Sequence, residues 1–176
     1  NVYENIVLPI ELDGKSVDQE FLKEIISILG LEERINSMPN MLSGGQQQRV
    51  AIARAIAQAP PVILADEPTG NLDSNSTQEI MEILKGLHRE GRTVILITHY
   101  MEEVIDADRV FVMDEGKVVM EGTPRQIFSR VEELKQLRLD VPQVTELAYE
   151  LSRSGVPIRS GILTNQELID ELMKLK

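Results

Sequence analysis

The sequence predicts an α/β fold in which a mostly parallel sheet is flanked by helices. A short apolar run, Val62–Ala65, is bounded by prolines and followed by two carboxylates, which is typical of a buried parallel strand. A second β-branched run, Thr93–Thr98, predicts another strand. The chain has 176 residues, 42% of them hydrophobic, so it can form one core and an appendage.

The segment before the first strand is predicted to be largely helical. Val2–Leu12 is a short apolar entry segment, and a core-facing helix follows over Asp18–Leu29, ended by Gly30. Its apolar residues at helical spacing are Phe21, Leu22, Ile25, Ile26 and Leu29. Met38-Pro39 breaks the chain before the next motif.

The most informative segment is Leu42-Ser43-Gly44-Gly45-Gln46, which leads through Gln47-Gln48-Arg49 into an alanine-rich helix. Two glycines let the backbone approach a ligand, and the helix N terminus presents unpaired N–H groups and a positive dipole end. The segment is therefore predicted to receive an anion such as phosphate. A plain Gly-Gly turn capped by Ser43 is the alternative.

Two acids, Asp66 and Glu67, close the first predicted strand. The carboxyl edge of a sheet is where ligands bind in open α/β folds, and an acidic pair there can hold a hydrated magnesium ion and orient a water. The alternative is a pair of solvated acids. The second strand, Thr93–Thr98, ends at His99.

Between these strands, the capping box Ser76–Glu79 is predicted to open a helix that ends near Gly91. Ile80, Leu84 and Leu87 lie on one face of it, and His88 is interpreted as a surface histidine with no role.

Further along, Asp114–Lys117 is predicted to turn Val110–Met113 into Val118–Met120 as a hairpin. Gly122-Thr123-Pro124 then leads into a short helix around Ile127 and Phe128.

The tail from Val131 is predicted to be helical, with a breaker at Pro142 and a stop at Gly155. The capping box Thr164–Glu167 opens a final helix. The expected apolar faces comprise Val144, Leu147, Ala148 and Leu151 in one helix and Leu168, Ile169, Leu172 and Met173 in the other.

Composition excludes several function classes. The net charge of −11 argues against a nucleic-acid partner, because phosphate backbones demand clustered Lys and Arg. No cysteine is present, so disulfides and thiolate metal sites are excluded. No apolar run approaches the ~20 residues that span a bilayer, so a membrane role is expected to be peripheral. No secretory signal is seen, and a cytoplasmic location is expected.

The signature Leu42–Gln46, the strand Val62–Glu67 (Walker B), the loop Gly70–Asp73 and His99, in this order and spacing, resemble the ATP-binding cassette (ABC) ATPases of membrane transporters. The resemblance is clear to about Gly122 and looser beyond it. The front of the chain and the loop around Gly70 resemble lipoprotein-release and macrolide-export ATPases. The tail resembles energy-coupling factor transporter ATPases, which take up vitamins and cobalt or nickel ions. Because the two ends resemble different subfamilies, a mosaic or engineered chain is an alternative.

A phosphate loop of the form G-x-x-x-x-G-K-[ST] is missing from the printed residues. The resemblance implies that this Walker A loop and the glutamine loop (Q-loop) lie before Asn1, so the chain is expected to be the C-terminal part of a P-loop NTPase core without the Walker A strand. In the related fold that strand lies between the strand ending at His99 and the strand Arg109–Asp114. Two edges would then lack a partner, and unpaired edges favour aggregation or strand borrowing. The isolated chain is expected to be inactive.

The resemblance implies ATP and Mg²⁺ as ligands and assigns catalytic roles to three residues. Asp66 would hold Mg²⁺ through water, and Glu67 would polarise the attacking water. His99 would contact the γ-phosphate and sense its loss.

The signature residues would act in trans, on ATP held by the phosphate loop of an opposing cassette. These are Ser43, Gly44, Gly45 and Gln46. Asp73 would couple the two sites of the dimer. The chain would then contain the residues that act on ATP held by the opposing cassette (the trans half-site). It would lack the phosphate loop that holds its own ATP (the cis half-site).

The resemblance also implies an organisation and partners. Residues 1–124 would be a partial ABC ATPase domain with a helical subdomain at about 13–58, and residues 125–176 a helical extension for dimerisation. Expected partners are a second ABC ATPase, in a homo- or heterodimer, and integral membrane subunits at the inner face of the cell membrane. The alternatives are a non-catalytic fragment that acts as an interaction module and a non-transport cassette, for example in translation or DNA repair.

Overall fold

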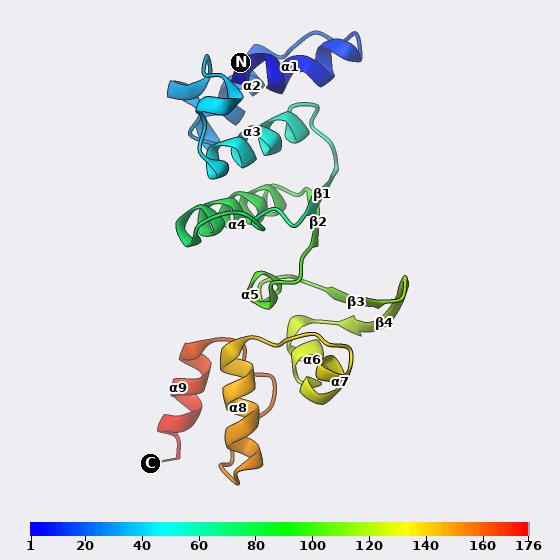
Figure 1. Ribbon diagram of the computed structural model, residues 1–176, viewed down its shortest axis with the longest axis vertical. Coiled ribbons are helices and arrows are strands. Elements are labelled where there is room, and N and C mark those ends of the chain that lie inside the picture. The colour runs from blue at the N-terminus through cyan, green and yellow to red at the C-terminus, as the bar shows by residue number, and fades with distance from the viewer. Residues whose placement is uncertain (176) are drawn as a thin grey trace. The chain divides into compact units, whose positions relative to one another are not determined.

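The computed structural model describes residues 1–175, which form two compact units that divide between Ile97 and Thr98 (Figure 1). The boundary predicted between an ATPase domain and a C-terminal extension, at residue 124, lies inside the second unit. That assignment of roles to the two parts stays a prediction.

The first unit contains helices and two strands (Figure 1). In chain order they are α1 (Val2–Leu12), α2 (Gln19–Ile28), the 3-10 turns η1 (Glu32–Arg34) and η2 (Pro39–Met41), α3 (Gly44–Ile56), β1 (Val62–Asp66), α4 (Ser74–Arg89) and β2 (Thr93–Ile97). The apolar segment at the start of the chain is therefore a helix, and it contains Pro9.

The predicted helix over Asp18–Leu29 is confirmed as α2. The Asp18 carboxylate accepts hydrogen bonds from the N–H groups of Glu20 and Phe21, which caps the helix. Gly30 follows the last turn with φ +59°, a conformation that glycine adopts without steric cost. Sequence signals at both ends thus fix this helix.

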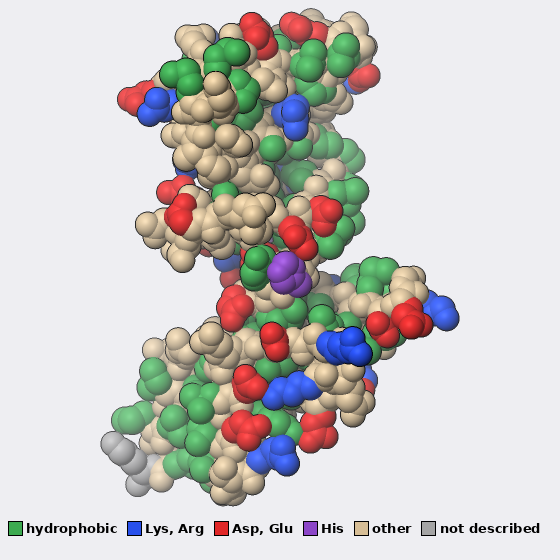
Figure 2. All heavy atoms as spheres, viewed as in Figure 1, with side chains coloured by type: hydrophobic (Ala, Val, Ile, Leu, Met, Phe, Trp, Pro, Cys, Tyr) green, Lys and Arg blue, Asp and Glu red, His purple; other side chains and the backbone are tan. Residues whose placement is uncertain are grey.

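Parallel pairing of the two strands is also confirmed, with Val62 opposite Thr93 and Asp66 opposite Ile97. The prediction that β1 is buried is wrong, because 71% of Leu64 and 45% of Val62 are exposed. Ile63 is the one fully buried side chain of β1, and Ala65 packs partly buried against the same core. Within the described residues the sheet has only two strands and helices cover one face, so the other face remains open. Figure 2 shows hydrophobic side chains reaching the surface.

The predicted start of α4 is also wrong. The helix begins at Ser74, because Asp73 caps it by accepting hydrogen bonds from the N–H groups of Asn75 and Ser76. The expected capping box at Ser76–Glu79 therefore lies inside the helix. Ile80, Leu84 and Leu87 are buried as predicted, while His88 is exposed.

The second unit contains a hairpin and a set of short helices (Figure 1). They are α5 (Met101–Val104), β3 (Val110–Asp114), β4 (Lys117–Gly122), α6 (Pro124–Phe128), α7 (Val131–Gln136), α8 (Gln143–Arg153) and α9 (Asn165–Met173). The predicted hairpin is confirmed: β3 and β4 are antiparallel, and Glu115 and Gly116 both have positive φ, as a tight primed turn requires.

The tail buries only part of its predicted apolar faces. Val144, Ala148 and Leu168 form a small core with Ile158 and Ile162. Other residues predicted to face the core are exposed: Leu147 at 52%, Ile169 at 52%, Leu172 at 39% and Met173 at 60%. Helical spacing located the helices, but the contacts of the described residues do not cover the whole apolar stripe.

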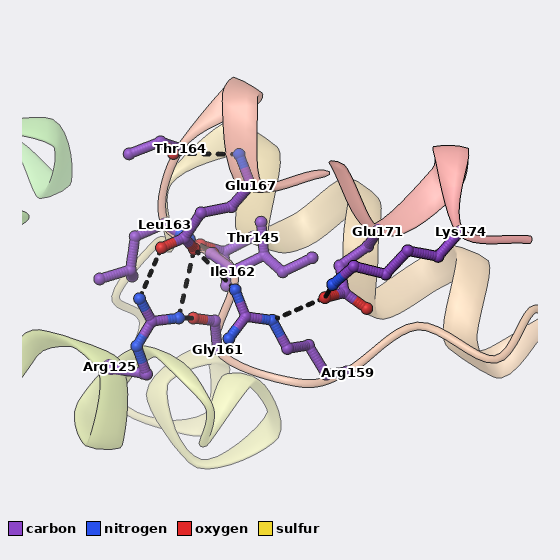
Figure 3. A network of polar contacts seen from close by, with 10 residues as sticks. All are labelled: Arg125, Thr145, Arg159, Gly161, Ile162, Leu163, Thr164, Glu167, Glu171 and Lys174. Atoms are coloured by element: carbon purple, nitrogen blue, oxygen red, sulfur yellow. Dashed lines mark hydrogen bonds and ion pairs between the residues drawn. The ribbon is translucent and has the colours of Figure 1, made fainter. Parts of the chain in front are cut away.

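An arginine on α6 fastens the start of α9 (Figure 3). Arg125 donates from Nη2 to Oε1 of Glu167 at 2.6 Å and from Nη1 to the carbonyl oxygen of Gly161 at 2.5 Å. Glu167 also accepts from the N–H of Leu163 at 3.0 Å. Thr164 caps α9 as predicted, but its expected capping-box partner Glu167 is occupied by Arg125 and Leu163.

Acid should loosen this contact. The Arg125 guanidinium holds the pKa of the Glu167 carboxyl below its ordinary value of 4.5. The carboxylate therefore contributes stability that is present above pH 4.5 and is lost as the pH falls through the lowered folded pKa. We expect amide hydrogen exchange in α9 to accelerate in that window.

The variant Arg125→Gln supplies the control. It should accelerate the same exchange at neutral pH by the equivalent of about 1 kcal/mol, a value reduced because both side chains are partly exposed. It should also flatten the acid dependence. An acid response of α9 that is unchanged in Arg125→Gln would contradict the assignment.

Candidate nucleotide site

The signature segment opens α3 as predicted. Ser43 is the N-cap: its hydroxyl accepts from the N–H of Gln46 at 3.3 Å, and the Gln46 side-chain oxygen accepts from the N–H of Ser43 at 3.0 Å. Gln47 donates from Nε2 to the carbonyl oxygens of Pro39 and Leu42, both at 3.2 Å. The loop is thus fixed to its own helix, whose first turn directs N–H groups outward.

The two signature glycines have different surroundings. Gly44 is exposed, and a Cβ there would lie 3.4 Å from Cδ2 of Leu72, an ordinary contact. Gly45 is buried, and a Cβ there would lie 2.7 Å from Oγ and 3.0 Å from Cβ of Ser76. Gly45 therefore lets the ends of α3 and α4 approach each other, a role that the sequence analysis missed.

The loop Gly70–Asp73 (the acidic loop) and the start of α4 lie against the signature segment. Leu72 of the loop is the neighbour of Gly44, and Ser76 of α4 is the neighbour of Gly45. Asp73 accepts at Oδ1 from the N–H groups of Asn75 and Ser76, at 3.1 and 3.0 Å, and at Oδ2 from the Ser76 hydroxyl at 2.7 Å. The Ser76 N–H and then its hydroxyl hold the pKa of the Asp73 carboxyl below its ordinary range. Asp73 is therefore ionised at neutral pH.

The acidic pair lies at the end of β1, as predicted. The N–H of Glu67 donates to the carbonyl oxygen of Ile97 at 2.8 Å, so the parallel pairing continues to this residue. Glu67 has φ +42°, a left-handed conformation that is uncommon for a side chain of this size. A Cβ on Gly70 would lie 3.6 Å from Oε2 of Glu67. Strained backbone of this kind concentrates at functional sites.

These residues fit a magnesium ion held mainly by water and phosphate. Asp66 and Glu67 are adjacent and exposed. Across residues 1–175, no group of three or more His, Asp or Glu side chains could form a complete metal cage. Magnesium keeps several waters and commonly binds through one or two carboxylates plus substrate phosphates, so a carboxylate pair suffices.

His99 belongs to the second unit. Its exposed ring lies beside Tyr100, with ring centroids 4.2 Å apart and planes tilted by 33°. The Tyr100 N–H donates to Oγ1 of Thr98 at 2.9 Å. The structure thus unites Ser43–Gln46, Asp66, Glu67 and Asp73 in one unit and places His99 in the other.

Comparison with known proteins agrees with this geometry. The family model described as ABC transporter matches residues 1–70. The energy-coupling factor transporter ATP-binding protein EcfA1 of Caldanaerobacter subterraneus subsp. tengcongensis is 51% identical over 168 residues, which are 95% of this chain. The chain is therefore similar to the ATP-binding proteins of ABC transporters. EcfA1 of Clostridium novyi is 53% identical over 154 residues, 87% of this chain.

A solved ABC cassette has a similar fold. The structure titled "Dimeric Structure of MJ0796, a Bacterial ABC Transporter Cassette" matches with a TM-score of 0.61 and 41% identity, covering 70% of this chain and 56% of that one. The chain spans 59% and 55% of the lengths of the two EcfA1 relatives. One relative aligns with 95% of the chain, so the front and the tail both match an energy-coupling factor ATPase.

No helix within residues 1–175 combines the length and the apolarity that a bilayer span requires.

Replacing each signature glycine by alanine should separate the two roles. Gly45→Ala should lower the free energy of unfolding by about 1–3 kcal/mol, because its methyl group would clash with Ser76. Gly44→Ala should be neutral or slightly stabilising, since it meets only ordinary contacts and gains helix propensity. Urea unfolding of the two variants beside the unmodified chain measures this. Equal effects of the two substitutions would contradict the packing role of Gly45.

Proposed function

We propose that this chain belongs to an ATP-binding subunit of an energy-coupling factor type ABC transporter, which hydrolyses ATP to power membrane transport as an ATPase dimer. The observation that carries the proposal is the placement of the signature glycines directly against the acidic loop, with the Asp66–Glu67 pair at the strand end of the same unit. The names of the EcfA1 relatives support this type of transporter.

The signature segment Ser43–Gln46 would contact ATP bound to the phosphate loop of an opposing cassette. Two features favour this role: the positive dipole end of the α3 N terminus, and the exposure of Ser43 and Gly44. Asp73, ionised at the start of α4, would couple the two sites of the dimer. Within the printed residues, then, the chain supplies the trans half of a nucleotide site.

The acidic pair would serve the other site of the dimer. Asp66 would hold a magnesium ion through water, and a bound magnesium ion neutralises charge that develops on the phosphate oxygens. Glu67 would accept a hydrogen bond from the attacking water and orient it toward the γ-phosphate, since positioning contributes most of phosphoryl-transfer catalysis. His99 would contact the γ-phosphate and respond to its loss.

The proposed partners are a second ABC ATPase and integral membrane subunits at the inner face of the cell membrane. The helical subdomain at about 13–58 would dock on the membrane subunits, and the extension at 125–176 would help to pair the ATPases. The exposed apolar residues of α8 and α9 support an interaction of the tail with another protein surface.

Binding of magnesium-ATP, measured by calorimetry, tests the trans half-site. We expect no binding by the chain alone, and binding with dimerisation when a full-length cassette supplies the phosphate loop. Ser43→Ala should weaken that binding, whereas Ser27→Ala, an exposed serine on α2, should not. Tight binding by the chain alone would show that another segment cradles the phosphates.

Hydrolysis tests Glu67 in a chimera that places the preceding region of the Caldanaerobacter relative before Asn1. Glu67→Gln should slow hydrolysis by about 100-fold or more, with ATP binding retained, because the amide cannot polarise the water. Glu24→Gln, an exposed acid on α2, should leave the rate unchanged. If Glu67→Gln hydrolyses as fast as the unmodified chimera, the role given to Glu67 is wrong.

A further inference from the structure

One serine joins the signature helix to the acidic loop. Ser76 lies in the first turn of α4, and its hydroxyl donates to Oδ2 of Asp73 at 2.7 Å. The same oxygen and its Cβ face the position where Gly45 would carry a Cβ, at 2.7 and 3.0 Å. Ser76 is therefore in contact with both motifs and belongs to neither.

The hydrogen bond to Asp73 fixes the rotamer of Ser76. Asp73 is itself held, because its other carboxylate oxygen accepts two backbone N–H groups of α4. With the carboxylate fixed at one end, the Ser76 side chain becomes a rigid surface toward α3. Only glycine fits at position 45 against that surface at these distances.

A second contact lies one turn further along the same interface. Arg49 of α3 forms an ion pair with Glu79 of α4 at 2.8 Å, and the Arg49 side chain is only 23% exposed. Gly45 and Arg49 are four residues apart on α3, and Ser76 and Glu79 are three apart on α4, so each pair shares one helix face. Contacts on two successive turns thus join α3 and α4 along one interface.

We propose that Ser76 is a positioning residue that holds the Gly45 end of the signature helix and the Asp73 carboxylate together, so that both move as one body. The inference rests on the proposed function, in which the signature contacts ATP in trans and Asp73 couples the two sites. Ser76 itself touches no nucleotide in this arrangement. Its hydrogen bond to Asp73 and its packing against Gly45 keep the two motifs at a constant distance from each other.

A double-mutant cycle tests the contact without ATP. Gly45→Ala should lower the urea midpoint of the unmodified chain, and in a Ser76→Gly background it should lower it by about half as much or less, because the clashing atoms are gone. Gly44→Ala is the matched control, since a Cβ there would meet Leu72 and Asn71. Its effect should be the same in both backgrounds. An equal effect of Gly45→Ala in both backgrounds would overturn the proposal.

Hydrolysis tests the positioning role in a complex of the chain with a full-length cassette whose own signature is inactivated. The active site then combines the phosphate loop of the cassette with the signature of this chain. Ser76→Ala should lower kcat by about 10-fold and leave KM for ATP within about twofold, because every residue that contacts ATP is retained and only the alignment of the signature is disturbed. Ser76→Thr keeps the hydroxyl and should restore kcat.

Ser74→Ala is the control in this assay, because Ser74 is an exposed residue of the same helical turn. If Ser76→Ala has the kcat of Ser74→Ala while the unmodified complex hydrolyses ATP, the positioning role is overturned and the proposed function stands. If the unmodified complex neither binds nor hydrolyses ATP, the proposed function fails, and the positioning role in catalysis fails with it. The stability cycle then still decides whether Ser76 joins the two helices.

Discussion

The close approach of α3 and α4 at Gly45 and Ser76 is the contact on which the candidate site depends. It brings the N terminus of the signature helix to the loop that carries Asp73, and the Arg49–Glu79 pair continues the contact by one turn. A side chain at position 45 would push the helix ends apart. The buried glycine thus serves helix packing, while the exposed Gly44 leaves backbone open toward a ligand.

In the same unit, the backbone is strained at Glu67, the residue proposed to orient the attacking water. Glu67 adopts a left-handed conformation immediately after β1, while its N–H still pairs with Ile97 of β2. The strand pairing therefore holds a costly backbone geometry in place and ends with two exposed acids at the sheet edge. Ile63 of β1 belongs to the same hydrophobic core as Ile52 and Ile56 of the signature helix.

The exposed sheet faces limit how much stability the strands themselves can contribute. Each sheet in the described part of the chain has two strands, and Leu64, Ile97, Phe111 and Met113 are all more than half exposed. A two-stranded pair gains little stability by itself, so helices on one face carry most of it. In the second unit the hairpin packs on α6 and α7, and the Arg125–Glu167 pair fastens α9.

The sequence by itself determined the helices that have their own caps and apolar spacing, such as α2. It also determined the parallel direction of β1 and β2, the hairpin turn and the resemblance to ABC ATPases. These features depend on residues close together in the chain or on fixed motifs. It misplaced the start of α4, because Asp73 caps the helix ahead of Ser76 and takes the Ser76 N–H that the expected capping box would have used. Only the tertiary structure decided which side chains are buried and why Gly45 must be glycine. Both depend on contacts between segments about thirty residues apart, whose distances local spacing does not encode.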